Sequence, residues 1–502
     1  MFVYAGRLVG TVDFKGNVVP ILLSPIRCCD RRSGRLGNNG ANVIRFRLNG
    51  AQVESEGFPL STTLLDYVRA VGLTGAKEGC AEGECGACTV VMAGAHECGS
   101  QYVPVNSCLI PLAAAAGHEV YTVEALAAGG QLCDAQQAMV SEGGSQCGSC
   151  TPGFVMSLFA EQYRPDRRGR IEVESLAGNL CRCTGYRPIR DAALSLREPP
   201  QDAFRARLNR AAPARTAVHV KCRDGEYHRP DSLEECLDLI ARNPGAQVMA
   251  GGTDLMVECN LRARRFPFVV GIDGMPELGV FRETGQSVMI GAGVTLSQIG
   301  ALWRDAPAAV RDWLRLFASP LIRNRATLGG NLATASPIGD AAPLLLAMNA
   351  AVHTSAGRVM ALSEFFRSYR VTALEAGEIV VWIEIPTPAA RSLRFYKVAK
   401  RRSDDISTVA AAFAVELGRD LRIESARFAY GGVAATPVRT LDAEDAVLGR
   451  PWNQETVRRA QDVIARTLKP ISDHRGSAAY RLALAQSLLE KYWAAAVHEE
   501  AA

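Results

Sequence analysis

Ten of the fifteen cysteines in this 502-residue chain lie between residues 80 and 183, and such bunching is typical of metal ligands. The segment GCAEGECGACTV (79–90) has the Cys-x4-Cys-x2-Cys spacing of iron–sulfur loops, formed by Cys80, Cys85 and Cys88. This spacing requires a distant fourth thiolate. Cys108 is the natural candidate, and Cys98, in a predicted hairpin tip, is the alternative. The glycines of the loop allow tight bending around a small anionic cluster, which incidental cysteines would not require.

A second group of thiols is divided between two segments of the chain. QCGSCTPG (146–153) supplies Cys147 and Cys150, and GNLCRCTGYRP (178–188) supplies Cys181 and Cys183. Cysteines one residue apart are unlikely to form a disulfide with each other without strain. Two thiolates from each segment can instead hold a second cluster. A four-cysteine zinc site is the alternative, because Cys-x2-Cys is common in zinc proteins, although Cys-x-Cys is less usual there. We expect most of the remaining cysteines to be core thiols.

Two glycine loops predict binding of a phosphate-containing cofactor. VMAGGTDL (248–255) is a strand that ends in small residues, whose backbone N–H groups can hold a pyrophosphate. This signal is weak alone, but RATLGGNLATASPIGDAAP (325–343) adds a second loop of the same kind. GAGVTL (291–296) lacks the third glycine of the dinucleotide fingerprint, and we interpret it as a structural turn.

Composition excludes several classes of function. A net charge of +4 with scattered basic residues does not favour nucleic-acid binding. No apolar run reaches the ~18 residues of a membrane span. VVPILLSPI near the N-terminus lacks the flanks of a secretory signal, and Arg31-Arg32 lacks the apolar stretch of a twin-arginine signal. We therefore expect a cytoplasmic protein.

The remaining sequence predicts the elements that position these residues. A strand at 43–50, a helix capped by Ser61 or Thr62, and strands at 89–94 and 102–105 indicate a small β-grasp domain. Short helices follow, with the second group of cysteines at their turns. The expected organisation is a disordered extension (1–42), a ferredoxin domain (43–120), a helical cluster domain (121–196), a linker (197–228), a domain with both glycine loops (229–392) and a C-terminal domain of strands followed by helices (393–498).

These motifs resemble those of the molybdenum hydroxylases, which include the xanthine dehydrogenases and aldehyde oxidases. The resemblance is carried by the Cys80–Cys88 loop, QCGSCTPG and GNLCRCTGYRPI. It implies that both clusters are 2Fe–2S, with ligands Cys80, Cys85, Cys88, Cys108, Cys147, Cys150, Cys181 and Cys183. Gln146 matches a glutamine that faces the pterin in that family. Ser149 replaces a frequent aromatic residue and is not a ligand change.

The second half of the chain resembles the xanthine dehydrogenase flavin domain, of the vanillyl-alcohol-oxidase type. The resemblance implies an α+β multidomain fold that binds FAD. The implied FAD residues are Val248, Met249, Ala250, Gly251, Gly252, Thr253, Asp254, Leu255, Phe317, Thr327, Leu328, Gly329, Gly330, Asn331, Ser336, Asp340, Val380 and Lys397. KRRSDDIS (400–407) matches a charged loop near the flavin that influences access of NAD+, although the residues alone favour a solvated turn.

The resemblance implies a conduit that carries electrons from a molybdopterin-binding partner subunit through two 2Fe–2S clusters to FAD and NAD+. Hypoxanthine and xanthine are the expected substrates of the partner, in a dimer of heterodimers, and this chain contributes no catalytic acid or base. The same conduit serving an aldehyde or N-heterocycle hydroxylase is the alternative, and oxygen is the alternative acceptor. A non-catalytic zinc-binding interaction protein is a more remote alternative.

Overall fold

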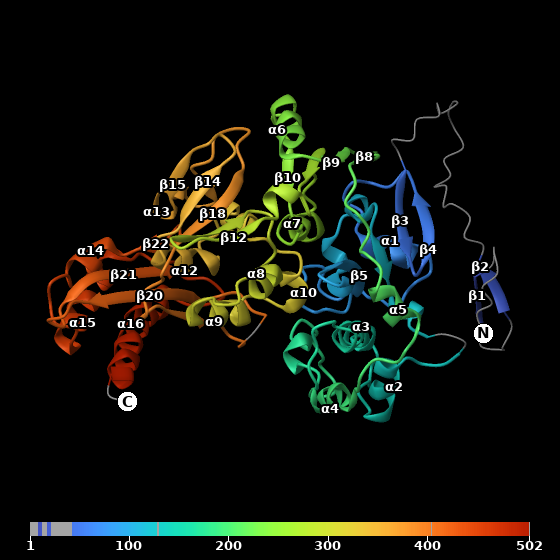
Figure 1. Cartoon of the computed structure of the whole chain (residues 1–502), viewed down its shortest axis with the longest axis horizontal. Helices are drawn as coiled ribbons and strands as arrows, with labels where there is room; N and C mark the ends of the chain where they lie inside the picture. Colours follow the sequence, from blue (N-terminus) through green and yellow to red (C-terminus); the bar gives the residue numbers. More distant parts are fainter. Residues whose placement is uncertain (1–8, 13–17, 22–42, 128–129, 403, 501–502) are drawn as a thin grey trace. The chain divides into compact units, whose positions relative to one another are not determined.

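The computed structural model describes residues 9–12, 18–21, 43–127, 130–402 and 404–500 (Figure 1). The chain divides into two compact units. Unit 1 comprises Met1–Asp273 and Ser319–Arg325, and unit 2 comprises Gly274–Ala318 and Ala326–Ala502. Within the predicted extension, β1 (Val9–Val12) pairs antiparallel with β2 (Val18–Ile21). The expectation of disorder for the rest of 1–42 lies outside the described residues. None of the helices in the described ranges is long and apolar enough to cross a membrane.

Unit 1 begins with the predicted ferredoxin sheet and its helix. The five strands are arranged in the order β4-β3-β7-β5-β6, with β3 and β7 parallel and the other pairs antiparallel. Buried and exposed residues alternate along β3, so that one face of this strand packs into the core with α1. The bounds are β3 (Ile44–Leu48), β4 (Ala51–Ser55), α1 (Leu64–Ala70), β5 (Thr89–His96), β6 (Gly99–Asn106) and β7 (Glu119–Tyr121).

The cap of α1 lies one residue beyond the predicted pair. The Thr63 hydroxyl accepts a hydrogen bond from the Asp66 N–H at 3.0 Å, and the Asp66 carboxylate accepts one from the Thr63 N–H at 2.9 Å. This reciprocal capping box decides the start of the helix, because it satisfies two N–H groups that would otherwise lack partners. Ser61 and Thr62 lie in the turn before it.

The predicted helical domain follows. It contains η4 (Val123–Ala125), α2 (Asp134–Ser141), α3 (Thr151–Gln162), η5 (Val173–Leu176) and α4 (Arg187–Ser195). The segment predicted as a linker (197–228) instead contains a helix, α5 (Ala203–Leu208), and further along the strand β8 (Val218–Lys221) and most of β9 (Glu226–Arg229). Its Arg207 is buried and forms an ion pair with Glu119 of the ferredoxin sheet, at 2.8 Å. One arginine of this segment therefore pairs with a glutamate that is distant in the sequence and lies beside it only in the folded chain.

Unit 1 also contains a four-stranded sheet in the order β10-β11-β9-β8. The strands β10, β11 and β9 are parallel, and β8 pairs antiparallel with β9 at the edge. The elements are β8 (Val218–Lys221), β9 (Glu226–Arg229), α6 (Leu233–Arg242), β10 (Gln247–Met249), α7 (Leu255–Arg262), β11 (Phe268–Gly271) and, after a stretch of unit 2, α10 (Pro320–Arg323).

Unit 2 starts with an antiparallel sheet in the order β12-β13-β18-β14-β15 and the helices between its strands. The elements are η6 (Pro276–Leu278), β12 (Phe281–Glu283), β13 (Ser287–Gly291), α8 (Leu296–Leu302), α9 (Ala308–Leu316), α11 (Leu328–Ala333), α12 (Ala341–Ala347), β14 (Ala351–Thr354), β15 (Val359–Ala361), α13 (Leu362–Phe365), β16 (Phe366–Ser368), β17 (Val371–Thr372) and β18 (Val380–Pro386).

A second antiparallel sheet, β19-β20-β21-β22, completes unit 2, followed by helices, as the sequence predicts. Figure 1 shows α16 against β20, and both contribute to one apolar core. The elements are β19 (Arg394–Val398), β20 (Val409–Leu417), β21 (Ile423–Gly431), β22 (Val438–Arg439), α14 (Leu441–Asp445), α15 (Gln454–Thr467) and α16 (Ala478–Glu500).

The capping box supports a test of the helix start. We expect Thr63→Ala to lower the free energy of unfolding by about 1 kcal/mol, because the Asp66 N–H loses its acceptor. Thr62→Ala, one residue earlier, is the matched control and should change it by less than about 0.5 kcal/mol. Urea unfolding measured by circular dichroism distinguishes the two residues, and equal effects would contradict the assignment.

Candidate functional site

The first group of predicted cysteines converges in unit 1. The Cys88 and Cys108 sulfurs lie 3.3 Å apart and are both buried. The Cys85 N–H points at the Cys80 sulfur, at 3.4 Å. A hydrogen bond from the Cys85 thiol lowers the pKa of Cys80 to about 5. Cys98 lies on the exposed hairpin, as the sequence predicts. This donor set fits a four-thiolate cluster that includes Cys108.

Two buried polar side chains hold the distant ligand against the loop. The Asn106 amide donates to the Gly83 carbonyl at 2.7 Å, and the Ser107 hydroxyl donates to the Cys88 carbonyl at 2.7 Å. Cys108 follows in the turn η2 (Ser107–Leu109). These bonds fix the position of a thiol that is 20 residues away in sequence from its neighbour Cys88.

The second group converges around the N-terminal turns of α3 and α4. The Cys147 thiol lies beside that of Cys183, and the Cys150 thiol lies beside that of Cys181. Burial raises the pKa of Cys150 to about 12. The Thr184 N–H donates to the Cys181 sulfur at 3.4 Å, as backbone groups do around iron–sulfur clusters. Cys147 and Cys183 are exposed, so this site lies at the surface of unit 1.

The two cysteine loops are in direct contact. The Leu180 N–H donates to the Cys85 carbonyl at 3.0 Å, and the Asn179 side chain donates to the Gly86 carbonyl at 3.1 Å. A Cβ on Gly86 would lie 2.2 Å from the Gly178 carbonyl oxygen, and one on Gly153 would lie 2.1 Å from the Gly86 carbonyl oxygen. Only glycine allows this approach. The loops are thereby held next to each other.

The glycine loop of unit 1 has the properties expected of a phosphate site. It connects β10 to α7, and Gly252 has a φ of +78°. Among the described residues, the N–H groups of Ala250, Gly251, Gly252 and Thr253 donate to no other group. Successive N–H groups of this kind fit a pyrophosphate. Of the other predicted residues here, Val248 and the buried Met249 are the last two residues of β10. Asp254 is the N-cap residue of α7, and Leu255 is the first residue of the helix.

Unit 2 contains the other predicted cofactor residues. Thr327 caps α11 and accepts a hydrogen bond from the Gly330 N–H at 3.1 Å. Gly329 packs on Ala292 of the GAGVTL turn, which has the structural role predicted for it. The Asn331 Oδ1 atom is buried without a partner among the described residues, as expected of a ligand contact. Leu328 is buried beside it, and Ser336 accepts a bond from the Ile338 N–H at 3.4 Å.

Two further predicted residues of unit 2 form a buried ion pair. The Lys397 ammonium lies 2.7 Å from the Asp340 carboxylate and also donates to the Leu316 carbonyl at 2.9 Å. The second Asp340 oxygen accepts a bond from Ser407 at 2.5 Å. Phe317 follows Leu316 at the end of α9, and Val380 begins β18, both buried. The Asp340 and Lys397 side chains thus hold each other in position.

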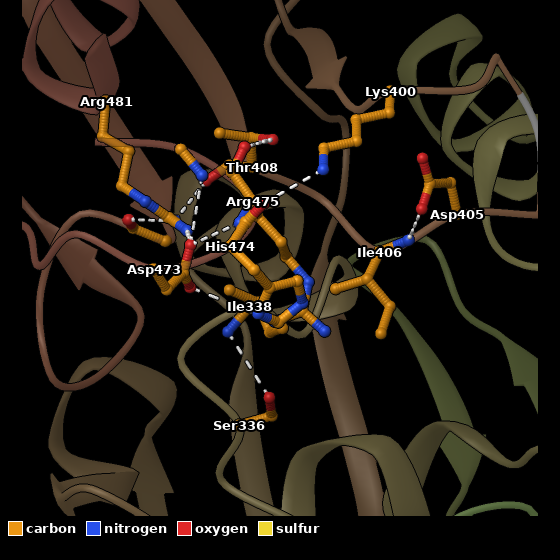
Figure 2. Close-up of polar contacts among 12 residues, drawn as sticks. Ser336, Ile338, Lys400, Asp405, Ile406, Thr408, Asp473, His474, Arg475 and Arg481 are labelled. Atoms are coloured by element: carbon orange, nitrogen blue, oxygen red, sulfur yellow. Dashed lines mark hydrogen bonds and ion pairs between the residues drawn. The ribbon is translucent and has the colours of Figure 1, made fainter. Parts of the chain in front are cut away.

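Residues 400–402 and 404–407 of the charged run lie in a loop of unit 2 (Figure 2). The Lys400 ammonium donates to the His474 carbonyl at 3.0 Å, and Asp405 accepts from the Ile406 N–H at 2.9 Å. Beside it, the fully buried Arg481 donates to the Thr408 carbonyl at 2.6 Å and to Asp473 at 2.7 Å. The loop is thus held by several side chains.

Four family models match consecutive parts of the chain. They are described as a 2Fe-2S iron-sulfur cluster binding domain (46–113), a [2Fe-2S] binding domain (122–194), an FAD binding domain in molybdopterin dehydrogenase (220–388) and a CO dehydrogenase flavoprotein C-terminal domain (394–496). The chain is an iron–sulfur and FAD module of the molybdenum hydroxylase family. The predicted α+β multidomain fold is confirmed.

Individual relatives are similar over most of the module. A xanthine dehydrogenase of Emericella nidulans is 33% identical over 82% of this chain and 35% of its own length. Xanthine dehydrogenase 1 of Arabidopsis thaliana is 30% identical over 86% of this chain and 38% of its own. The module therefore spans slightly more than a third of these curated relatives.

Solved structures match about half of the module. A chain of quinoline 2-oxidoreductase from Pseudomonas putida 86 is 29% identical, with a TM-score of 0.50, over 54% of this chain and 96% of its own. A chain of carbon monoxide dehydrogenase from Hydrogenophaga pseudoflava is also 29% identical, with a TM-score of 0.50, over 53% of this chain and 94% of its own.

Sequence reasoning missed the asparagines that connect the loops of unit 1. Asn260, on α7, donates to the Ala81 carbonyl at 2.8 Å and to the Cys108 carbonyl at 2.9 Å. It therefore links the first cysteine loop to the helix that follows the glycine loop. Asn179, inside GNLCRC, plays the corresponding part between the two cysteine loops. The position of Asn179 inside a cysteine motif was the one available signal, and Asn260 had none.

The choice between Cys108 and Cys98 supports a direct test. We expect Cys108→Ala to lower the iron content from about four to about two atoms per chain, because one of two binuclear clusters loses a ligand. Cys98→Ala should leave the iron content unchanged. Iron analysis and the electron paramagnetic resonance of the reduced protein measure both, and iron loss in the Cys98 variant would contradict the assignment.

The buried ion pair between Lys397 and Asp340 supports a second test. We expect Lys397→Met to destabilise the protein by about 3–5 kcal/mol and to reduce bound FAD, because the Asp340 carboxylate stays buried without its cation. Adding Asp340→Asn should recover part of the loss. Lys400→Met, at an exposed lysine, is the control and should have little effect. Thermal unfolding and flavin content measure all three variants, and equal losses for both lysines would contradict this role.

Proposed function

We propose that this module is the electron-transfer subunit of a xanthine dehydrogenase. In this proposal, hypoxanthine and xanthine are oxidised to urate on a molybdopterin-binding partner subunit, and NAD+ is the final acceptor. The observation that carries the proposal is that two curated xanthine dehydrogenases are at least 30% identical along 82% and 86% of this chain. We further propose cytoplasmic localisation and a dimer of heterodimers with the partner.

The geometry of each unit supports the proposed site residues. We propose the eight converging cysteines as cluster ligands, and residues 248–255 and 327–331 as FAD-binding segments. The proposed domain boundaries are those predicted from the sequence, except that the FAD-binding domain begins at residue 220, where its family model starts and strand β8 runs. When bound, such clusters transfer single electrons and FAD accepts two. The residues of this chain hold the loops that bind the cofactors in position. Asn179 joins the cysteine loops, Asn260 joins the first of them to α7, and the free N–H groups of Ala250–Thr253 bind phosphate.

A second candidate is the same electron conduit for another molybdenum hydroxylase. It is supported by the solved quinoline 2-oxidoreductase chain, which is 29% identical over 96% of its own length. An N-heterocycle or an aldehyde would then replace the purine. The two candidates share every residue role in this chain and differ only in the substrate of the partner.

The test uses the complex purified from the native host through this chain. We expect xanthine to drive NADH formation, and this activity should be lost when the partner is removed. NADH formation with quinoline or an aldehyde but not with xanthine would favour the second candidate. No reduction of either the flavin or the clusters by NADH would contradict NAD+ as the acceptor.

A variant separates the two ends of the conduit. We expect Cys181→Ser to abolish xanthine-driven NADH formation, because one cluster loses a ligand. NADH-driven reduction of ferricyanide, which requires only the flavin end, should continue at a rate within about twofold of the parent. Equal loss of both activities would contradict a conduit in which the second cluster lies between substrate and flavin.

A further inference from the structure

One face of the hairpin β8–β9 carries a cluster of metal-ligating side chains outside the sites described above. His219 on β8 lies directly across from His228 on β9, and Lys221 lies across from Glu226. Side chains two residues apart on a strand share a face, so these four project from the same side of the hairpin. The opposite face carries Val220 and Tyr227, which are buried in the core.

The three potential ligands converge on one point. The Nε2 atoms of His219 and His228 each lie 3.2 Å from the same oxygen, Oε2 of Glu226. Two ligands bound to a tetrahedral zinc ion at 2.0–2.1 Å are about 3.3 Å apart, close to these separations. All three ligand atoms lie within 4.8 Å of one another. Because the two rings stack nearly parallel, the half-exposed His219 side chain would have to turn for both imidazole nitrogens to point at the ion.

The surroundings hold the His228 imidazole in place. The His219 and His228 rings stack with centroids 4.1 Å apart, and the His228 ring stacks on Phe268 of β11 at 4.6 Å. His228 is thereby fixed in the sheet between two rings. The His219 side chain is 49% exposed, which leaves the site open to solvent.

We propose that His219, Glu226 and His228 form a zinc site on the hairpin at the start of the FAD-binding domain. Two imidazole nitrogens and one carboxylate are a common set for zinc, and the open side leaves room for a water ligand. The ion would connect the edge strand β8 to β9. Lys221 weakens zinc binding at this site, because its ammonium lies 3.4 Å from the other Glu226 oxygen and repels a cation.

The experiment uses the cluster- and flavin-loaded chain, prepared without a histidine tag and dialysed against Zn²⁺. We expect one zinc ion per chain by elemental analysis in addition to the iron. X-ray absorption at the zinc edge should show nitrogen and oxygen ligands and no sulfur. A sulfur shell would place the zinc at the cysteines and overturn the proposal, as would the absence of bound zinc.

Three variants make the test specific. His219→Asn, at a half-exposed position on an edge strand, should lose the zinc while its circular dichroism is unchanged. Lys221→Gln should bind zinc about fivefold more tightly, because the opposing charge is gone. The control is His353→Asn, which removes an imidazole 2.8 Å from Glu384 in unit 2, where no second histidine converges among the described residues. Zinc retained by His219→Asn, or unchanged affinity in Lys221→Gln, would overturn the proposal.

Discussion

The closeness of the two cysteine loops is the constraint on which unit 1 depends. The Gly86 carbonyl lies where a side chain on Gly153 would be, and the Asn179 amide donates to the same carbonyl at 3.1 Å. A methyl group at either glycine would force the loops apart. Because the rate of electron transfer falls steeply with distance, backbone contact between ligand loops is a direct way for a protein to keep two clusters close.

Side-chain hydrogen bonds also connect the glycine loop of unit 1 to the first cysteine loop. Asn260 on α7 holds the Ala81 and Cys108 carbonyls together, so the helix after the glycine loop is anchored to the first cysteine group. Such amides are satisfied by bonds to the backbone and contribute rigidity rather than acid–base chemistry. The chain's contribution to function is therefore positional, which is consistent with an electron-transfer module.

Unit 2 is held by buried charges instead. Lys397 and Asp340 are paired away from solvent. Arg481 is fully buried and donates to the Gly432 carbonyl. It also donates to the Thr408 carbonyl and to Asp473 (Figure 2). Burying charges is costly unless each is paired and hydrogen-bonded. Here the partners come from separate loops, strands and helices, so that the pairs connect Asp340 to β19 and Asp473 to α16.

The sequence by itself determined which residues can do chemistry and the order of the domains. Cysteine spacing predicted both thiol groups, because a cluster requires several thiolates, and hydrophobic periodicity predicted the main strands and helices. Tertiary structure decided what depends on distant partners. It placed Cys108 beside Cys88, moved the cap of α1 to Thr63 through Asp66, and gave Arg207 a buried partner in Glu119. Asn260 and the hairpin histidines show the same limit, since their neighbours are set by sheet register and packing, which local patterns do not encode.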